Sequence, residues 1–198
     1  MADVYEIRES AIGDPGPLGL AGFALTTFIL SMSNAHLVPA AIGTLFVPLA
    51  LFYGGIAQML AGMWEFKKNN TFGAVAFTSY GAFWLSLASV IILLGLKLID
   101  LGTSVDYALG LFLTAFTIFT FYMWIGTFRI NNALLAVFSF LMITFILLDL
   151  ANFGFISSVP GGIFGLITAA CAWYASAAGI INPLYGRAVL PVGSRSGK

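Results

Sequence analysis

Charged residues are scarce in this chain: aspartate, glutamate, lysine and arginine make up 8% of its 198 residues, whereas apolar residues make up 60%. A water-soluble domain of this size cannot hide so much apolar surface, because a large share of its residues stays on the outside. A lipid bilayer removes this problem, since about 20 apolar residues in a helix cross its hydrocarbon core. The composition therefore excludes a soluble domain and predicts a polytopic, all-α membrane protein.

Histidine and cysteine occur once each, as His36 and Cys171, and no charged residue lies near the middle of an apolar stretch. The single cysteine excludes an intrachain disulfide. Membrane enzymes need a buried nucleophile with its base, or clustered carboxylates and histidines around a metal. We therefore expect no catalytic residue, no metal site and no cofactor, and predict that the chain is not an enzyme. A net charge of zero argues against a nucleic-acid partner.

Six apolar stretches are candidates for transmembrane helices, at residues 18–32, 40–63, 71–94, 107–126, 132–150 and 161–181. The connections are short, so we expect consecutive helices to pack as antiparallel neighbours in one bundle. This divides the chain into an N-terminal tail (1–17), a transmembrane domain (18–181) and a C-terminal tail (182–198). All lysines and arginines except Lys97 fall on the side of the two termini. The positive-inside rule then predicts that both termini are cytoplasmic.

Uncharged polar and small residues recur at helical spacing inside three of these stretches. The stripes are Phe23, Thr27, Ser31 and Asn34; Gly55, Gln58, Gly62 and Glu65; and Gly110, Thr114, Thr117 and Phe121. Such stripes either line a pathway or hydrogen-bond one helix to another, and for the hydroxyl groups both alternatives stay open. The amide of Gln58 is costly to leave unpaired in hydrocarbon, which favours a position on a pathway.

Prolines and glycines mark further local features. Pro48 predicts a kink in the second stretch. A small-residue face on the sixth stretch, which includes the Gly161–Gly165 step, predicts close helix packing within the bundle or between protomers.

The segment before the first stretch reads D-P-G-P at residues 14–17, in which Asp14 can cap the helix. The amides of Leu18, Gly19 and Leu20 then become helix-start donors for a carboxylate, or for water.

Several of these segments resemble the succinate–acetate permeases, also called the acetate uptake transporter family. Residues 14–20 (D-P-G-P-L-G-L) are similar to the family's N-P-A-P-L-G-L signature. The resemblance continues through F-Y-G-G-I-A-Q at 52–58, E-F-K-K-N-N-T-F-G at 65–73 and A-F-T-S-Y-G-A-F-W at 76–84, and ends with G-R at 186–187 and L-P-V-G at 190–193. It covers essentially the whole chain, with Asp14 and Gly16 standing where the family has asparagine and alanine.

This resemblance implies a six-helix protomer that assembles as a homo-hexamer in the lipid bilayer of the cell membrane, with one pathway in each protomer. It also implies a hydrophobic constriction made by Phe23, Tyr80 and Leu141. Helical rise places these three residues at a similar depth, about 9–15 Å from the cytoplasmic end of their helices. Three large side chains at one depth can close a pore by dewetting.

The predicted function is transport of acetate and related small carboxylates, succinate among them, accompanied by a proton. The predicted substrate contacts are Leu18, Gly19, Leu20, Thr27, Gln58 and Ser79. Two alternatives remain open at this point: a passive channel for the acetate anion, and a membrane sensor or scaffold that transports nothing.

Overall fold

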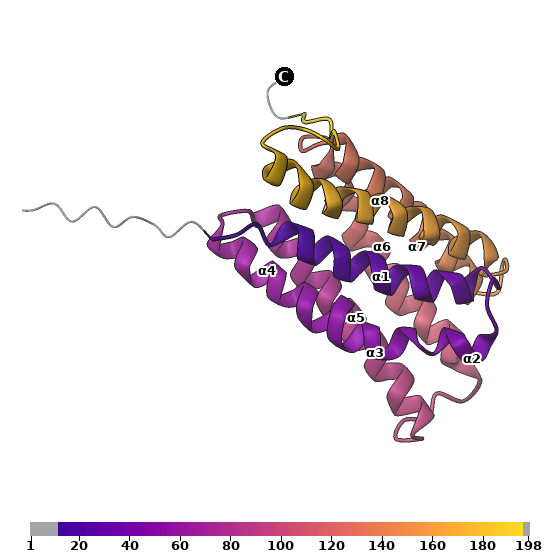
Figure 1. Ribbon diagram of the computed structural model, residues 1–198. Helices are drawn as coiled ribbons and strands as arrows, with labels where there is room; N and C mark the ends of the chain where they lie inside the picture. Colours follow the sequence, from indigo (N-terminus) through magenta and orange to yellow (C-terminus); the bar gives the residue numbers. More distant parts are fainter. Residues whose placement is uncertain (1–11, 196–198) are drawn as a thin grey trace, which may run out of the picture.

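The computed structural model describes residues 12–195, and six segments of this part are long and apolar enough to cross a membrane (Figure 1). Five of them are single helices: α1 (Gly16–Asn34), α5 (Thr71–Gly95), α6 (Val105–Thr127), α7 (Asn132–Asn152) and α8 (Val159–Tyr185). The second crossing combines α2 (Ala40–Gly43), α3 (Phe46–Leu51), a π-helical turn η1 (Phe52–Ala57) and α4 (Gln58–Lys67), and a short 3-10 turn η2 (Gly102–Ser104) precedes α6. The predicted all-α fold with six spans is confirmed.

Helix α1 lies between two groups of helices, with α3, α4 and α5 on one side and α7 and α8 on the other (Figure 1). The chain enters α1 and leaves α8 at the same end of the bundle (Figure 1). The predicted N-terminal tail lies mostly outside the described residues, as do residues 196–198. The cytoplasmic position of this end stays a prediction.

Helices α1 and α8 approach each other through small residues. A β-carbon at Gly162 would overlap the backbone of Ala35, and one at Gly179 would lie 2.8 Å from Cγ of Pro17. The hydroxyl of Ser176 donates a hydrogen bond to the carbonyl oxygen of Pro17 at 2.7 Å. The small-residue face of α8 therefore serves packing within the protomer.

The second crossing is interrupted where Pro48 predicts it. Proline lacks an N–H and clashes with the carbonyl one turn earlier, which here belongs to Thr44. The helix breaks at that point: α2 ends at Gly43, and the carbonyl oxygen of Thr44 accepts from the amide of Val47 at 3.0 Å instead. The predicted kink is confirmed, and it lies one helical turn before Pro48.

A π-helical turn follows, over Phe52–Ala57. Helix α1 passes this turn at backbone contact distance, since a β-carbon at Gly22 would lie 2.5 Å from the carbonyl oxygen of Tyr53. A β-carbon at Gly54 would likewise lie 2.5 Å from Oγ1 of Thr26. Single π-helical turns inside helices are rare overall, but those that occur are often at functional sites. This turn ends directly before Gln58.

Helix α8 continues beyond the predicted boundary at residue 181 to Tyr185 and is closed by Gly186 in the left-handed region, with φ of 61°. The segment after it folds back on the turn between α6 and α7. The amides of Asn132 and Ala133 donate to the carbonyl oxygens of Gly193 and Val192 at 2.9 and 3.1 Å. The described part of the C-terminal segment is thus packed against the bundle.

We expect Gly162→Ala to destabilise the protein by about 1–3 kcal/mol, because the added methyl group meets the backbone of Ala35, which cannot move aside as a side chain can. Gly95→Ala is the matched control, since nothing lies within 4 Å of a β-carbon at that position. The measurement is thermal stability of the detergent-solubilised protein. Equal stability of the two variants would contradict backbone contact between α1 and α8.

Candidate functional site: two cavities that meet at Phe23 and Leu141

Two cavities lie inside the bundle, one behind the other. The inner cavity has a volume of about 440 Å³ and opens at the end where α1 begins, with Asp14, Asn131 and Val192 among its lining residues. The outer cavity has a volume of about 410 Å³ and reaches the opposite end, with Asn34 and Ser158 among its lining residues. Together they span the protomer from one end to the other.

Of the described residues, Phe23 and Leu141 line both cavities, so they form the layer that separates them. Phe23 is 5% exposed and Leu141 is 4% exposed. Tyr80 lines the inner cavity beside them, and its ring centroid lies 5.6 Å from that of Phe23. The three residues predicted as the constriction come from α1, α5 and α7 and meet at one depth.

The hydroxyl group of Tyr80 is directed at α6, where its oxygen lies 2.8 Å from Oγ1 of Thr120. This hydrogen bond holds the tyrosine ring in place and uses the polar end of the side chain. Tyr80 therefore contributes its ring to the wall of the inner cavity, and the separating layer between the cavities is apolar.

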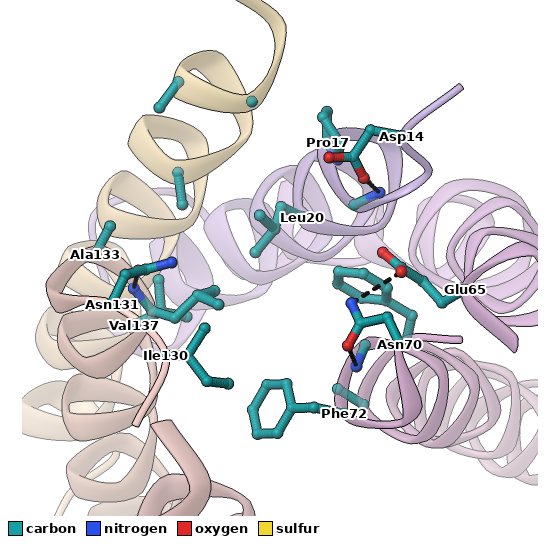
Figure 2. A pocket seen from close by; sticks show the side chains of 18 of the residues that line it. Asp14, Pro17, Leu20, Glu65, Asn70, Phe72, Ile130, Asn131, Ala133 and Val137 are labelled. Atoms are coloured by element: carbon teal, nitrogen blue, oxygen red, sulfur yellow. Dashed lines mark hydrogen bonds between the residues drawn. The ribbon is translucent and has the colours of Figure 1, made fainter. Parts of the chain in front are cut away.

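Charged groups gather at the mouth of the inner cavity. Figure 2 shows Asp14, Glu65 and Asn70 on one side of it, across from Ile130 and Asn131. The carboxylate of Asp14 pairs with Nζ of Lys68 at 2.8 Å. Glu65, only 1% exposed, accepts a hydrogen bond from Nδ2 of Asn70 at 2.8 Å.

Two of the three predicted amide donors at the start of α1 are used within the helix. The helix begins at Gly16, two residues earlier than expected, so the amide of Gly19 already donates to the carbonyl oxygen of Pro15 at 3.2 Å. Leu20 lies a full turn inside the helix, where amides pair within the helix, and contributes its side chain to the inner cavity. Leu18 is 44% exposed and lines neither cavity. The prediction of free amide donors is therefore wrong for Gly19 and Leu20, whereas for the amide of Leu18 it stays a prediction.

The remaining predicted contacts divide between the cavities. Gln58 is 1% exposed and lines the inner cavity, where its Oε1 has no hydrogen-bond partner among the described residues. Thr27 lines the outer cavity, and its Oγ1 is also unpaired. Ser79 lies in α5 and lines neither cavity. Gln58 and Thr27 therefore line the cavities with unpaired polar groups, and Ser79 does not.

One polar group of the outer cavity was missed from the sequence. Trp84 lines this cavity, and its Nε1 is buried without a hydrogen-bond partner. Hydropathy ranks tryptophan with the apolar residues of its span and does not reveal its N–H donor. The signal that could have found it is its position one helical turn after Tyr80 on the same face of α5.

For the stripes on α1 and α6, the structure shows whether the polar residues line a cavity or join one helix to another. On α1, the side chains of Phe23, Thr27, Ser31 and Asn34 all line the outer cavity. On α6, Oγ1 of Thr117 donates to the carboxylate of Asp149 on α7 at 2.7 Å, and the stripe lines neither cavity. The α1 stripe therefore lines a cavity, whereas the α6 stripe joins two helices.

The described residues contain no group of three histidine, cysteine, aspartate or glutamate side chains close enough to hold a metal ion.

Six spans around two cavities in series define a multi-pass membrane protein of the cell membrane with an internal passage that one apolar layer interrupts. A model of the GPR1/FUN34/yaaH family matches residues 2–193, and the chain belongs to this family.

Its relatives include the succinate-acetate/proton symporter SatP of Escherichia coli K12, 39% identical over 184 residues, which cover 92% of this chain and 96% of the symporter. Ammonia transport outward protein 2 of Saccharomyces cerevisiae is 43% identical over 176 residues, which cover 84% of this chain and 61% of that protein. The solved structure of the bacterial acetate channel SatP superposes with a TM-score of 0.86 at 38% identity and covers 92% of this chain and all of that one. The resemblance to the acetate transporters is thus confirmed, and each of these relatives is named for transport or a channel.

Replacing Asn70 should destabilise the protein more than replacing Asn131. Both side chains cap a helix, through the amides of Gly73 at 3.1 Å and Leu134 at 2.8 Å, and loss of a cap costs about 1 kcal/mol. Asn70 also donates to the buried carboxyl group of Glu65, and loss of that bond costs about 1.5–3 kcal/mol more.

The measurement is denaturant unfolding of Asn70→Ala and Asn131→Ala in detergent. Adding Glu65→Gln to the Asn70→Ala variant should bring its loss of stability closer to that of Asn131→Ala, because the side chain left unpaired at position 65 is then uncharged. Equal losses for the two single variants would show that the contact with Glu65 contributes nothing.

Proposed function

We propose that this protein transports acetate and related small carboxylates, succinate among them, across the cell membrane through the two cavities of each protomer. The observation that carries the proposal is the apolar layer of Phe23 and Leu141 between two cavities that open at opposite ends. The symporter SatP and the acetate channel SatP, to which the chain is similar along nearly its whole length, support the choice of substrate.

We propose further that a proton accompanies the substrate. A carboxylate loses its hydration in an apolar layer, and this desolvation is costly. None of the residues at the constriction carries a charge that could compensate it, since Phe23, Tyr80 and Leu141 are all uncharged. Passage as the neutral acid, or together with a proton, avoids most of the cost. A wetted channel for the acetate anion is the alternative.

The proposal includes a homo-hexamer with cytoplasmic termini. The two cavities lie inside one bundle of six spans, which fits one pathway for each protomer. Large apolar side chains such as Ile118 and Tyr122 are exposed on the outside of the bundle, where lipid or a neighbouring protomer can cover them. A catalytic role is not part of this proposal, because the relatives of this chain are named for transport or a channel.

Uptake of labelled acetate into proteoliposomes of the purified protein tests the function. Protein-free liposomes are the necessary control, since neutral acetic acid crosses lipid unaided. Uptake above this background that follows an imposed pH gradient at fixed membrane potential supports proton coupling. Uptake that follows the potential and ignores the pH gradient indicates an anion channel. Without excess uptake under either condition, the protein would be a sensor or scaffold.

Leu141→Ala should widen the constriction and raise the uptake of bulkier carboxylates, such as butyrate and benzoate, relative to acetate. The physical reason is that Leu141 faces both cavities and its truncation opens the layer between them. The measurement is the ratio of uptake rates for the competing substrates in proteoliposomes.

Leu60→Ala is the matched control, because Leu60 is 52% exposed and lines neither cavity. Both variants are first checked for a single peak in gel filtration, since truncation of a buried leucine costs about 2–5 kcal/mol. An unchanged ratio in a well-folded Leu141 variant would remove this residue from the constriction.

A further inference from the structure

We propose that the ion pair of Asp14 and Lys68 at the mouth of the inner cavity selects monocarboxylates over dicarboxylates. The carboxylate of Asp14 cancels the positive charge of Lys68, so an entering anion finds no net attraction there, and a dianion such as succinate loses more by this than acetate does. This inference rests on the proposed function and names the substrate class that the mouth favours.

Lys68 carries the one positive charge that lines the passage. Among the described residues that line either cavity there is no other lysine, no arginine and no histidine. The acidic residues of this lining are Asp14 and Glu65 in the inner cavity and Asp106 in the outer cavity. A carboxylate that enters from the inner end can therefore be attracted by Lys68 alone, and only if that charge is available.

The charge of Lys68 is already paired. Its Nζ lies 2.8 Å from Oδ1 of Asp14. The same oxygen atom accepts a hydrogen bond from the amide of Gly16 at 3.0 Å, which holds the carboxylate at the start of α1. Lys68 directly follows α4, so the ion pair connects the beginning of α1 with the end of the second crossing.

Glu65 does not take the place of Asp14 in this pair. Figure 2 shows Asp14 and Glu65 on the same side of the mouth. The side chain of Glu65 is 1% exposed and accepts a hydrogen bond from Nδ2 of Asn70 at 2.8 Å. A substrate carboxylate must therefore displace Asp14, rather than Glu65, to reach the ammonium group of Lys68.

The ion pair affects the substrate more than it affects the fold. The side chains of Lys68 and Asp14 are 39% and 47% exposed, and exposed ion pairs contribute little to stability. Their charges nevertheless lie where a substrate enters, within the distance of about 10 Å over which charges interact at 0.1 M salt. Coulomb energy is proportional to the charge of the substrate. A change of charge at the mouth therefore acts twice as strongly, on a logarithmic scale of affinity, on the succinate dianion as on acetate.

Asp14→Asn removes the charge and keeps the shape of the side chain. The amide oxygen of asparagine can still accept from the amide of Gly16, so the start of α1 is preserved while Lys68 loses its partner. At neutral pH, where both acids are ionised, we expect the half-maximal concentration for transport to fall about threefold for acetate and about tenfold for succinate. A fall that is no larger for succinate than for acetate would overturn the proposal.

Asp100→Asn is the matched control. The carboxylate of Asp100 accepts from the amide of Gly102, two residues further along the chain as at Asp14, but it lines neither cavity. This variant should leave the ratio of the two half-maximal concentrations unchanged. An equal change of the ratio in both variants would trace the effect to the net charge of the protein and overturn the role of the mouth.

Lys68→Gln separates the charge of Lys68 from the structure of the helix start. Alone, it should raise both half-maximal concentrations, and that of succinate more strongly. Combined with Asp14→Asn, it leaves both positions uncharged, and the ratio should return to that of the unmutated protein. If the double variant kept the ratio of Asp14→Asn, Lys68 would not be the source of the selectivity.

The measurement for all variants is exchange of labelled for unlabelled acid, at equal concentrations on both sides of the membrane of proteoliposomes. Every protein molecule then offers its inner mouth to the substrate, whichever way it is inserted. Protein-free liposomes give the background.

A second measurement needs no transport, because a ligand that binds the folded protein raises its melting temperature. Against sodium chloride at equal ionic strength, sodium succinate should stabilise Asp14→Asn in detergent more than the unmutated protein or the double variant. Equal stabilisation of all three would overturn the role of the ion pair. If the unmutated protein exchanges neither acid but this order of stabilisation holds, the proposed function fails and the role of the ion pair stands.

Discussion

The close packing of α1 against its neighbours is the constraint on which the rest of the structure depends. Gly162 of α8 meets the backbone of Ala35 on one side, and Gly22 of α1 meets the backbone of Tyr53 in the π-helical turn on the other. Contacts at this distance leave no freedom to rotate α1 about its axis. The face with Phe23 and Thr27 is therefore directed at the interior, where one residue helps to separate the cavities and the other lines the outer one.

The π-helical turn connects this packing to the chemistry of the passage. Two neighbouring glycines in the turn let α1 and α5 come close, and the turn ends directly before Gln58. An extra residue in a helical turn changes which side chains face inward for the rest of the helix. The result is a buried amide whose carbonyl oxygen faces the inner cavity without a partner. Such a group is expensive in hydrocarbon, and a passing ligand or water can satisfy it.

The charged residues of the passage lie at its two ends. Those at the mouth of the inner cavity are paired or hydrogen-bonded. Asp14 pairs with Lys68, and Glu65 is held by Asn70. Between these groups and the outer end the passage offers uncharged donors and acceptors and one apolar layer. This arrangement suits a small molecule that becomes neutral by protonation, since no charged group between the two ends replaces the hydration of an ion.

The sequence by itself determined the number of spans and the interruption of the second one, whereas the residues predicted for the constriction came from the resemblance to the acetate transporters. Hydropathy and proline act locally, and helical rise adds only that Phe23, Tyr80 and Leu141 lie at a similar depth. The sequence did not determine which polar groups face the passage: Ser79 lines neither cavity, the amide of Gly19 is already bonded to Pro15, and the unpaired N–H of Trp84 lines the outer cavity. Only the tertiary structure decided these points, because whether a buried donor is paired depends on the helix that packs against it.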